Sequence, residues 1–187
     1  MSLFRELRPV ACRISDREFV RRHGGLYLLT TLPTEEEDFD FHTNVATNPL
    51  ALADELLAGD AEQIFAGKEL VRIENSGRNH LSTQATVGRA LNNDVVLRHP
   101  SVSKLHAYFE LPRDFAPETA SSLRLVDAGS ANGTEVNGRA LPADAPVVVQ
   151  TGARLVFGDV DGELLDAAEL YQLIRDVYPT PELFRRR

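Results

Sequence analysis

Short apolar runs separated by turn residues occupy the middle of the chain, from about residue 68 to 162. Runs rich in β-branched and aromatic residues lie at 70–74, 85–89, 95–97, 107–111, 123–126, 147–149 and 154–157. Several short strands with no helix between them are typical of a sandwich or barrel, not of a parallel α/β sheet. Asn137-Gly138 predicts a hairpin, because a type I′ turn requires a positive φ at both central positions. The pattern therefore predicts a mainly β domain.

An extension with helical character precedes this zone, over residues 1–67. Ser15 and Glu18 have the spacing of a capping box, in which each side chain satisfies a backbone N–H at the start of a helix. Gly24 predicts the end of that helix, and 26–31 is predicted to be a short strand. We expect an α/β extension, whose role the sequence does not reveal.

Two further features of the extension are local. Asn48 followed by Pro49 predicts a helix start, with asparagine as the cap and proline at the first position. Residues 35–40 form an acidic run that is expected to lie in a solvated loop.

Residues 163–187 are predicted to be a C-terminal helix and tail that pack on or near the sandwich. Asp166 and Glu169 repeat the capping-box spacing. Four apolar residues then follow one helical face at i, i+3, i+4 and i+7: Leu170, Leu173, Ile174 and Val177. Pro179 predicts the end of the helix.

Composition narrows the class of protein. A chain of 187 residues with 43% apolar residues can bury a core without a disulfide or metal. Cys12 is the single cysteine, so no intrachain disulfide forms and a reducing, cytoplasmic location is expected. No signal peptide and no membrane insertion are expected, because the first 15 residues lack an apolar run and no apolar stretch reaches a bilayer's thickness. The net charge of −8 argues against binding to nucleic acid.

The segment 68–106 departs from this acidic average. It holds six basic and three acidic residues, so its net charge is +3 and that of the remainder is −11. A basic island in an acidic protein favours a localised anion over a polyanion.

Three predicted loops hold polar residues that a sandwich core does not need: 87–94 (VGRALNND), 102–107 (VSKLHA) and 127–138 (DAGSANGTEVNG). Arg89 offers a planar fork of donors that suits a phosphate. Ser103 adds a hydroxyl and Lys104 a mobile positive charge. Asn132 pairs a donor with an acceptor, which suits a peptide backbone.

These motifs, Gly-Arg, Ser-x-x-His, Ser-x-Asn-Gly-Thr and Val-Asn-Gly in this order, resemble the forkhead-associated (FHA) domain over residues 68–162. The resemblance implies a sandwich of about 11 strands whose loops at one end bind a phosphothreonine peptide. It implies that Arg89 and Ser103 contact the phosphate, that Lys104 assists, and that Asn132 holds the peptide backbone.

The resemblance also implies supporting residues and one departure. Gly88, His106 and Gly133 are implied to be structural, with His106 bracing the loops. Ala131 stands where the family often has threonine or another polar residue, so a hydroxyl near the phosphothreonine is lost. Lower affinity or altered selectivity is expected.

Catalysis, a cofactor and a metal site are not expected. The five histidines have no paired ligand spacing, and a single cysteine cannot make a thiolate site. Asp159, Asp161 and Gly162 resemble part of a calcium loop, but the other ligand positions do not follow, so a hairpin or turn is predicted. There is neither a P-loop nor a nucleophile elbow.

Thr34 precedes the acidic run and is a candidate phosphorylation site. Because some FHA proteins bind a phosphothreonine in their own N-terminal segment, phosphorylated Thr34 is a candidate internal or intermolecular ligand. The alternative is an unmodified residue in a solvated loop.

Three functions remain open. The first is an adaptor that binds threonine-phosphorylated proteins downstream of a Ser/Thr kinase. The second is a scaffold that uses the same fold without phosphate. The third, an enzyme within residues 1–67, has little chemistry to support it.

Overall fold

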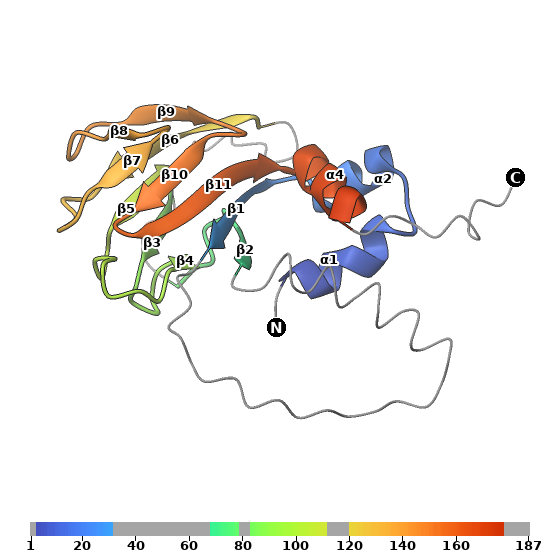
Figure 1. Cartoon of the computed structure of the whole chain (residues 1–187), viewed down its shortest axis with the longest axis horizontal. Helices are drawn as coiled ribbons and strands as arrows, with labels where there is room; N and C mark the ends of the chain where they lie inside the picture. The colour runs from blue at the N-terminus through green and yellow to red at the C-terminus, as the bar shows by residue number, and fades with distance from the viewer. Residues whose placement is uncertain (1–2, 32–67, 79–82, 112–119, 178–187) are drawn as a thin grey trace, which may run out of the picture.

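The computed structural model describes residues 3–31, 68–78, 83–111 and 120–177 (Figure 1). In these ranges eleven strands form two sheets packed as a β-sandwich, which confirms the predicted fold class. One sheet has the order β2 (Lys68–Arg72), β1 (Leu26–Thr31), β11 (Val160–Asp166), β10 (Arg154–Phe157), β7 (Thr134–Val136), β8 (Arg139–Ala140). The other has the order β4 (Val95–Val96), β3 (Gln84–Gly88), β5 (Ala107–Glu110), β6 (Ser122–Asp127), β9 (Val147–Gln150).

Strand neighbours are antiparallel except for β3 and β4, which pair in parallel over two residues. Every predicted run is a strand within two residues at each end. The predicted hairpin joins β7 to β8, with φ of 51° at Asn137 and 74° at Gly138. Positive φ at both positions is what a type I′ turn requires.

The hydrophobic pattern did not predict strand β11. Its sequence, VDGELLD, mixes charges with Gly162 and hides the period-two pattern. The hairpin predicted around Asp159 does exist, but its turn lies at Gly158–Asp159, whereas Asp161 and Gly162 lie within β11. A Cβ atom at Gly162 would lie 3.1 Å from Leu28 Cδ1 in the neighbouring strand, so a glycine allows close packing here.

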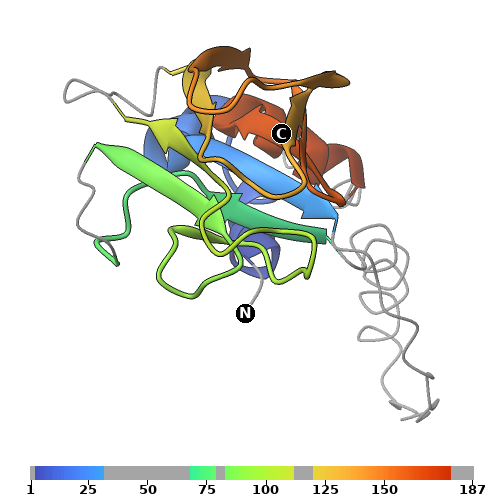
Figure 2. The ribbon, with the colours of Figure 1, turned by 90° about the vertical axis from the view of Figure 1, so that its left-hand side faces the viewer.

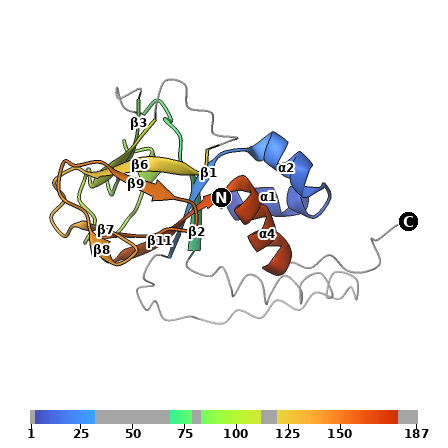
Figure 3. The same cartoon turned by 90° about the horizontal axis from the view of Figure 1, so that it is seen from above.

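Within the described residues, three helices cover the outer face of the six-stranded sheet at one end (Figure 3). They are α1 (Leu3–Ala11), α2 (Asp16–His23) and α4 (Ala167–Val177). The phenol of Tyr171 on α4 donates a hydrogen bond of 3.1 Å to the carbonyl of Ile14, which ties α4 to the turn between α1 and α2. The predicted C-terminal helix is therefore present and packs against the sheet.

Strand β1 separates two hydrophobic cores. Leu26 and Leu28 face the core between the sheets, whereas Tyr27 and Leu29 face a second core beneath the helices. Alternate residues of a strand point to opposite faces, so an uninterrupted apolar run supplies both cores. The predicted N-terminal extension thus contributes a strand to the sandwich itself, paired with β11 and β2.

The two predicted capping boxes differ in the structure. At α4, Asp166 Oδ1 accepts from the N–H of Glu169 at 2.8 Å, and Glu169 Oε2 accepts from the N–H of Asp166 at 3.0 Å, so the box is complete. At α2, Ser15 Oγ accepts from the N–H of Glu18, but the Glu18 carboxylate pairs with Arg21 and Arg22. Two nearby guanidinium groups attract the carboxylate more strongly than a single backbone N–H does.

Several predictions fall outside the described residues: the acidic run 35–40, the helix start at Asn48, Thr34 and the helix end at Pro179. Over the described ranges, no helix has the length and apolar character needed to cross a bilayer.

Candidate functional site

The three polar loops meet at the end of the sandwich away from the helices, which faces the viewer in Figure 2. They are the β3–β4 loop (89–94), the β4–β5 loop (97–106) and the β6–β7 loop (128–133). The β10–β11 turn lies there too, because Gly158 N–H donates to Gly133 O at 3.1 Å. The pairing of β1 with β11 runs from Leu26–Asp166 at the helical end to Thr31–Asp161 at the loop end.

Backbone hydrogen bonds join the β3–β4 loop to the β4–β5 loop. Arg89 N–H donates to Ser103 O at 3.0 Å, and Ala90 N–H donates to Lys104 O at 3.2 Å. Gly88 is required at this approach, because a Cβ there would lie 2.4 Å from Lys104 O. The Gly-Arg motif therefore places Arg89 beside Ser103 and Lys104.

Asn93 reinforces this junction from beneath. Its side chain is buried, and its amide donates to Lys104 O at 2.7 Å and to Ala90 O at 2.8 Å. A third bond, from Asn93 N–H to Ala90 O at 3.1 Å, closes a turn over residues 90–93. The β3–β4 loop is thus held in one conformation.

The neighbouring Asp94 fixes the far end of the same loop. Its buried carboxylate accepts from the backbone and hydroxyl of Ser76 through Oδ1 and from those of Thr86 through Oδ2, at 2.6–2.9 Å. Asp94, one of the three acidic residues of the segment 68–106, is therefore buried and hydrogen-bonded inside the fold, not exposed on the loop surface.

His106 connects the second loop to the third. The ring is fully buried; Nδ1 accepts from Ser103 N–H at 3.0 Å and Nε2 lies 3.0 Å from Gly133 O. Because Nδ1 accepts, a neutral ring carries its proton on Nε2 and donates to Gly133. Burial lowers the pKa of His106, opposed by the bond to Gly133 and the charge of Asp127.

Asp127, at the end of β6, shapes the β6–β7 loop. Its buried carboxylate accepts from Ser130 N–H at 2.8 Å, from Ser130 Oγ at 2.7 Å and from Thr134 Oγ1 at 2.6 Å. Burial alone raises the pKa of this carboxyl, but the bonds from Thr134 and Ser130 outweigh it, so the pKa of Asp127 is lowered. The charged form therefore holds the loop.

The β6–β7 loop in turn contacts the β4–β5 loop. Ala131 N–H donates to Ser103 Oγ at 3.0 Å, and Asn132 Nδ2 donates to Ser101 O at 2.8 Å. Ser101 Oγ accepts from Asp159 N–H at 2.8 Å. Four segments distant in sequence are thus bonded into one surface.

Hydrogen-bonding capacity remains on this surface. The Ser103 hydroxyl accepts from Ala131, which leaves its own proton free to donate outward. Asn132 uses one amide proton, so a second proton and the carbonyl oxygen remain.

The side chains of Arg89 and Lys104 are exposed, and neither forms an ion pair with any residue in the described ranges. Two cations next to a free hydroxyl form a surface for an anion with several acceptor oxygens. The structure thus brings together Arg89, Ser103, Lys104 and Asn132 on adjacent loops.

The roles of Asn93, Asp127 and Ser101 were not predicted from the sequence. In the structure, hydrogen bonds of these three residues hold the loops that carry the site. Asp127 with Ser130 three positions later is a recognisable turn pattern. Asn93 and Ser101 gave no comparable signal, because their partners, Lys104 O and Asn132 Nδ2, lie in other loops.

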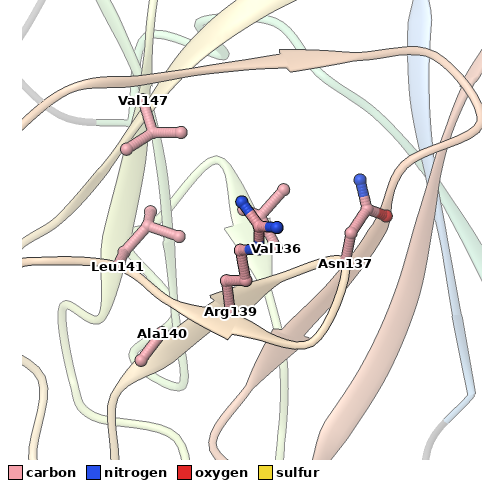
Figure 4. Close-up of a pocket in the computed structure, with 6 residues that line it drawn as sticks. All are labelled: Val136, Asn137, Arg139, Ala140, Leu141 and Val147. Carbon is pink, nitrogen blue, oxygen red and sulfur yellow. The ribbon is translucent and has the colours of Figure 1, made fainter.

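A surface pocket of about 490 Å³ lies between the β7–β8 hairpin and β9, lined by Val136, Asn137, Arg139, Ala140, Leu141 and Val147 (Figure 4). None of the predicted site residues lines it. Among the described residues, no three metal-ligating side chains gather.

The fold is a β-sandwich of two sheets whose polar loops meet at one end. The family model of the FHA domain matches residues 85–158, which span β3 to the β10–β11 turn and include every predicted site residue except Thr34. This part of the chain is an FHA domain.

The chain is also similar to individual proteins. The DNA damage response protein kinase DUN1 of Saccharomyces cerevisiae is 33% identical over 100 residues, which cover 54% of this chain and 18% of that kinase. Most of that kinase therefore has no counterpart in this sequence.

Solved structures include the yeast Dun1 FHA domain in complex with a doubly phosphorylated peptide derived from Rad53. It is 21% identical with a TM-score of 0.46, over 76% of this chain and 74% of that one. The FHA domain of CT664 from Chlamydia trachomatis is 16% identical with a TM-score of 0.44, over 75% of this chain and 97% of that one.

Proposed function

We propose that this protein is a phosphothreonine-peptide-binding adaptor. The observation that carries the proposal is the cluster of Arg89, Ser103, Lys104 and Asn132 on loops that are hydrogen-bonded to one another within an FHA domain. Arg89, Ser103 and Lys104 would hold the phosphate, and Asn132 the peptide backbone. The Dun1 FHA domain, a relative in fold, has been solved with a phosphorylated peptide.

Physical chemistry supports a reversible complex. A phosphate carries about −1.5 to −2 charge and three acceptor oxygens at neutral pH. Each charge-assisted hydrogen bond contributes about 1.5–3 kcal/mol net. Two or three such bonds, less the cost of ordering a peptide, correspond to a Kd on the order of micromolar. Arg89 and Lys104 are exposed, so added salt should weaken the complex.

Preference for threonine over serine rests on a single methyl group. Its burial contributes about 0.8 kcal/mol, or roughly a fourfold difference in Kd. Strong discrimination would need conformational effects as well, so phosphoserine peptides should bind measurably more weakly than phosphothreonine peptides.

The test is calorimetric titration of the full chain with a degenerate phosphothreonine peptide library and its unphosphorylated match. Arg89→Ala should weaken phosphopeptide binding by about 10- to 100-fold, because the phosphate loses its bidentate partner. Arg124→Ala is the matched control, since Arg124 is an exposed arginine on β6 that pairs with Glu110. Equal loss in both variants, or binding without phosphate, would contradict the proposal.

A scaffold that binds without phosphate is the second candidate, and Ala131 favours it. This residue supplies a backbone N–H to Ser103 but no hydroxyl to a ligand. The scaffold predicts partner binding that survives phosphatase treatment and Arg89→Ala.

The cellular setting belongs to the proposal. We place the protein in the cytoplasm, downstream of a Ser/Thr kinase that phosphorylates its partner. Phosphorylation of Thr34, outside the described residues, stays a prediction.

A further inference from the structure

Large apolar side chains are exposed at three positions of the described chain: Leu91 at 66%, Leu105 at 44% and Val148 at 63%. Leu91 lies on the loop of Arg89, and Leu105 follows Lys104 directly. Val148 lies on β9, the edge strand of its sheet. Single exposed leucines need no explanation, but these two stand on the same loops as Arg89 and Lys104, at the candidate functional surface.

The tip that carries Leu91 is rigid. Leu91 is the second residue of the turn Ala90–Asn93. Three hydrogen bonds from Asn93 hold this turn, two to Ala90 O and one to Lys104 O. A leucine held there loses little conformational entropy when a ligand covers it.

Leu105 lies on the adjacent segment. The bonds from Arg89 to Ser103 and from Ala90 to Lys104 advance one residue at a time along both loops. The next residues on the two segments are Leu91 and Leu105. The backbone arrangement therefore carries both leucines to the same side of the Ser103–Lys104 pair.

That side is opposite to Asn132. The β6–β7 loop contacts the β4–β5 loop through Ser101, Ser103 and His106, whereas the β3–β4 loop contacts it through Ser103 and Lys104. The order follows the sheet, in which β5 lies between β3 and β6. The β4–β5 loop, which carries Ser103, Lys104 and Leu105, thus lies between Asn132 and Leu91.

We infer that Leu91 and Leu105 form a specificity surface that selects a phosphopeptide with a large apolar residue on one side of its phosphothreonine, the side away from Asn132. The inference rests on the proposed function and deepens it. Its occupant is the bound peptide itself, because Leu91 and Leu105 stand on the same loops as the phosphate-binding residues. A peptide anchored by its phosphate has its flanking residues next to the loops, so a leucine or isoleucine there would cover apolar surface from water.

The test uses phosphothreonine libraries in which one flanking position at a time is randomised, with the full chain as the binder. We expect selection of Leu, Ile, Met or Phe on one side of the phosphothreonine only. For the selected peptide, Leu91→Ser and Leu105→Ser should each weaken binding by about fivefold. A peptide with serine at the selected position should be insensitive to both substitutions.

Val148→Ser is the matched control, because Val148 is as exposed as Leu91 but lies on the β9 edge. It should bind both peptides like the wild type. Leu91→Met keeps an apolar surface and should retain selection, which separates loss of contact from loss of fold.

The outcomes separate the two proposals. Phosphate-dependent binding that disappears in Arg89→Ala but has no apolar preference overturns this inference alone. Apolar selection that survives the double variant Leu91→Ser, Leu105→Ser also overturns it. Absence of phosphopeptide binding overturns the proposed function and this inference together.

Discussion

Single side chains at this site form hydrogen bonds with residues that lie far from one another in sequence. His106 is the clearest case, because its two ring nitrogens join Ser103, beside the phosphate-binding residues, to Gly133, beside Asn132. The bond from Ser103 N–H requires an unprotonated Nδ1. Protonation of the ring would therefore break the link on the Ser103 side.

His106 predicts a pH dependence of stability. In the unfolded chain its pKa is near the ordinary value of about 6.5, and burial lowers it in the folded chain. Above that pH both states are neutral; as the pH falls towards 5, the unfolded chain binds the proton first. The free energy of unfolding should then decrease by up to about 1.4 kcal/mol per pH unit. His106→Gln should reduce this loss, measured by urea unfolding at pH 7 and pH 5.

A variant or the pH range distinguishes the contributions of other titratable groups to this loss of stability. Burial also lowers the pKa of His23, so His23→Gln measures its share separately. The lowered pKa of Asp127 places its loss of stability in more acidic solution, below the ordinary carboxyl range. An identical decrease between pH 7 and pH 5 in the wild type and in His106→Gln would refute this role for His106.

At the scale of elements, helix α4 depends on its start. Asp166 Oδ1 accepts from Ala168 N–H and Glu169 N–H, both at 2.8 Å, while Glu169 returns a bond to Asp166. The helix begins directly after β11, so the cap also fixes the angle at which α4 folds back over the sheet. The spacing of Asp166 and Glu169 made this start predictable, whereas β11 itself was hidden by its charges.

Removal of the cap should lower stability without touching the core. Asp166→Ala should reduce the free energy of unfolding by about 1 kcal/mol, because two backbone N–H groups lose their acceptor. Asp176→Ala, at the other end of α4, is the control. A carboxylate near a helix C-terminus is unfavourable, so its removal should be neutral or slightly stabilising. Equal effects of the two substitutions would show that the cap contributes nothing.

At the scale of the whole molecule, the two cores share strands β1 and β11. β1 gives Leu28 to the core of the sandwich and Tyr27 to the core beneath the helices, and β11 does the same with Leu164 and Leu165. The helices therefore stabilise the sheet that carries the β10–β11 turn, and that turn contacts the site. The helical end and the loop end are opposite ends of these two strands.

This sharing predicts that the molecule unfolds as one unit. Leu170→Ala should cost about 2–5 kcal/mol, because Leu170 is fully buried under the helices. Hydrogen exchange should then show the same loss of protection in α4 and in β5, which lies in the other sheet. Faster exchange confined to the helices would mean that the two cores unfold independently.

Much of the architecture follows from the sequence alone, because it depends on local patterns. Runs of β-branched and aromatic residues between turn residues located most strands, capping spacing located two helix starts, and Asn137-Gly138 located a hairpin through its requirement for positive φ. The loop sequences likewise marked Arg89, Ser103, Lys104 and Asn132, through the donor chemistry of their side chains and the order of motifs that resembles the FHA domain.

Only the tertiary structure decided how these pieces meet. It paired β1 with β11 from the other end of the chain, put the Asn93 side chain beneath Lys104, and left Leu91 and Leu105 exposed beside the cations. None of these follows from local pattern, because each depends on the burial or hydrogen bonding of partners distant in sequence. The sequence determined which residues stand on the loops; the packing of the two sheets decided which of them share a surface.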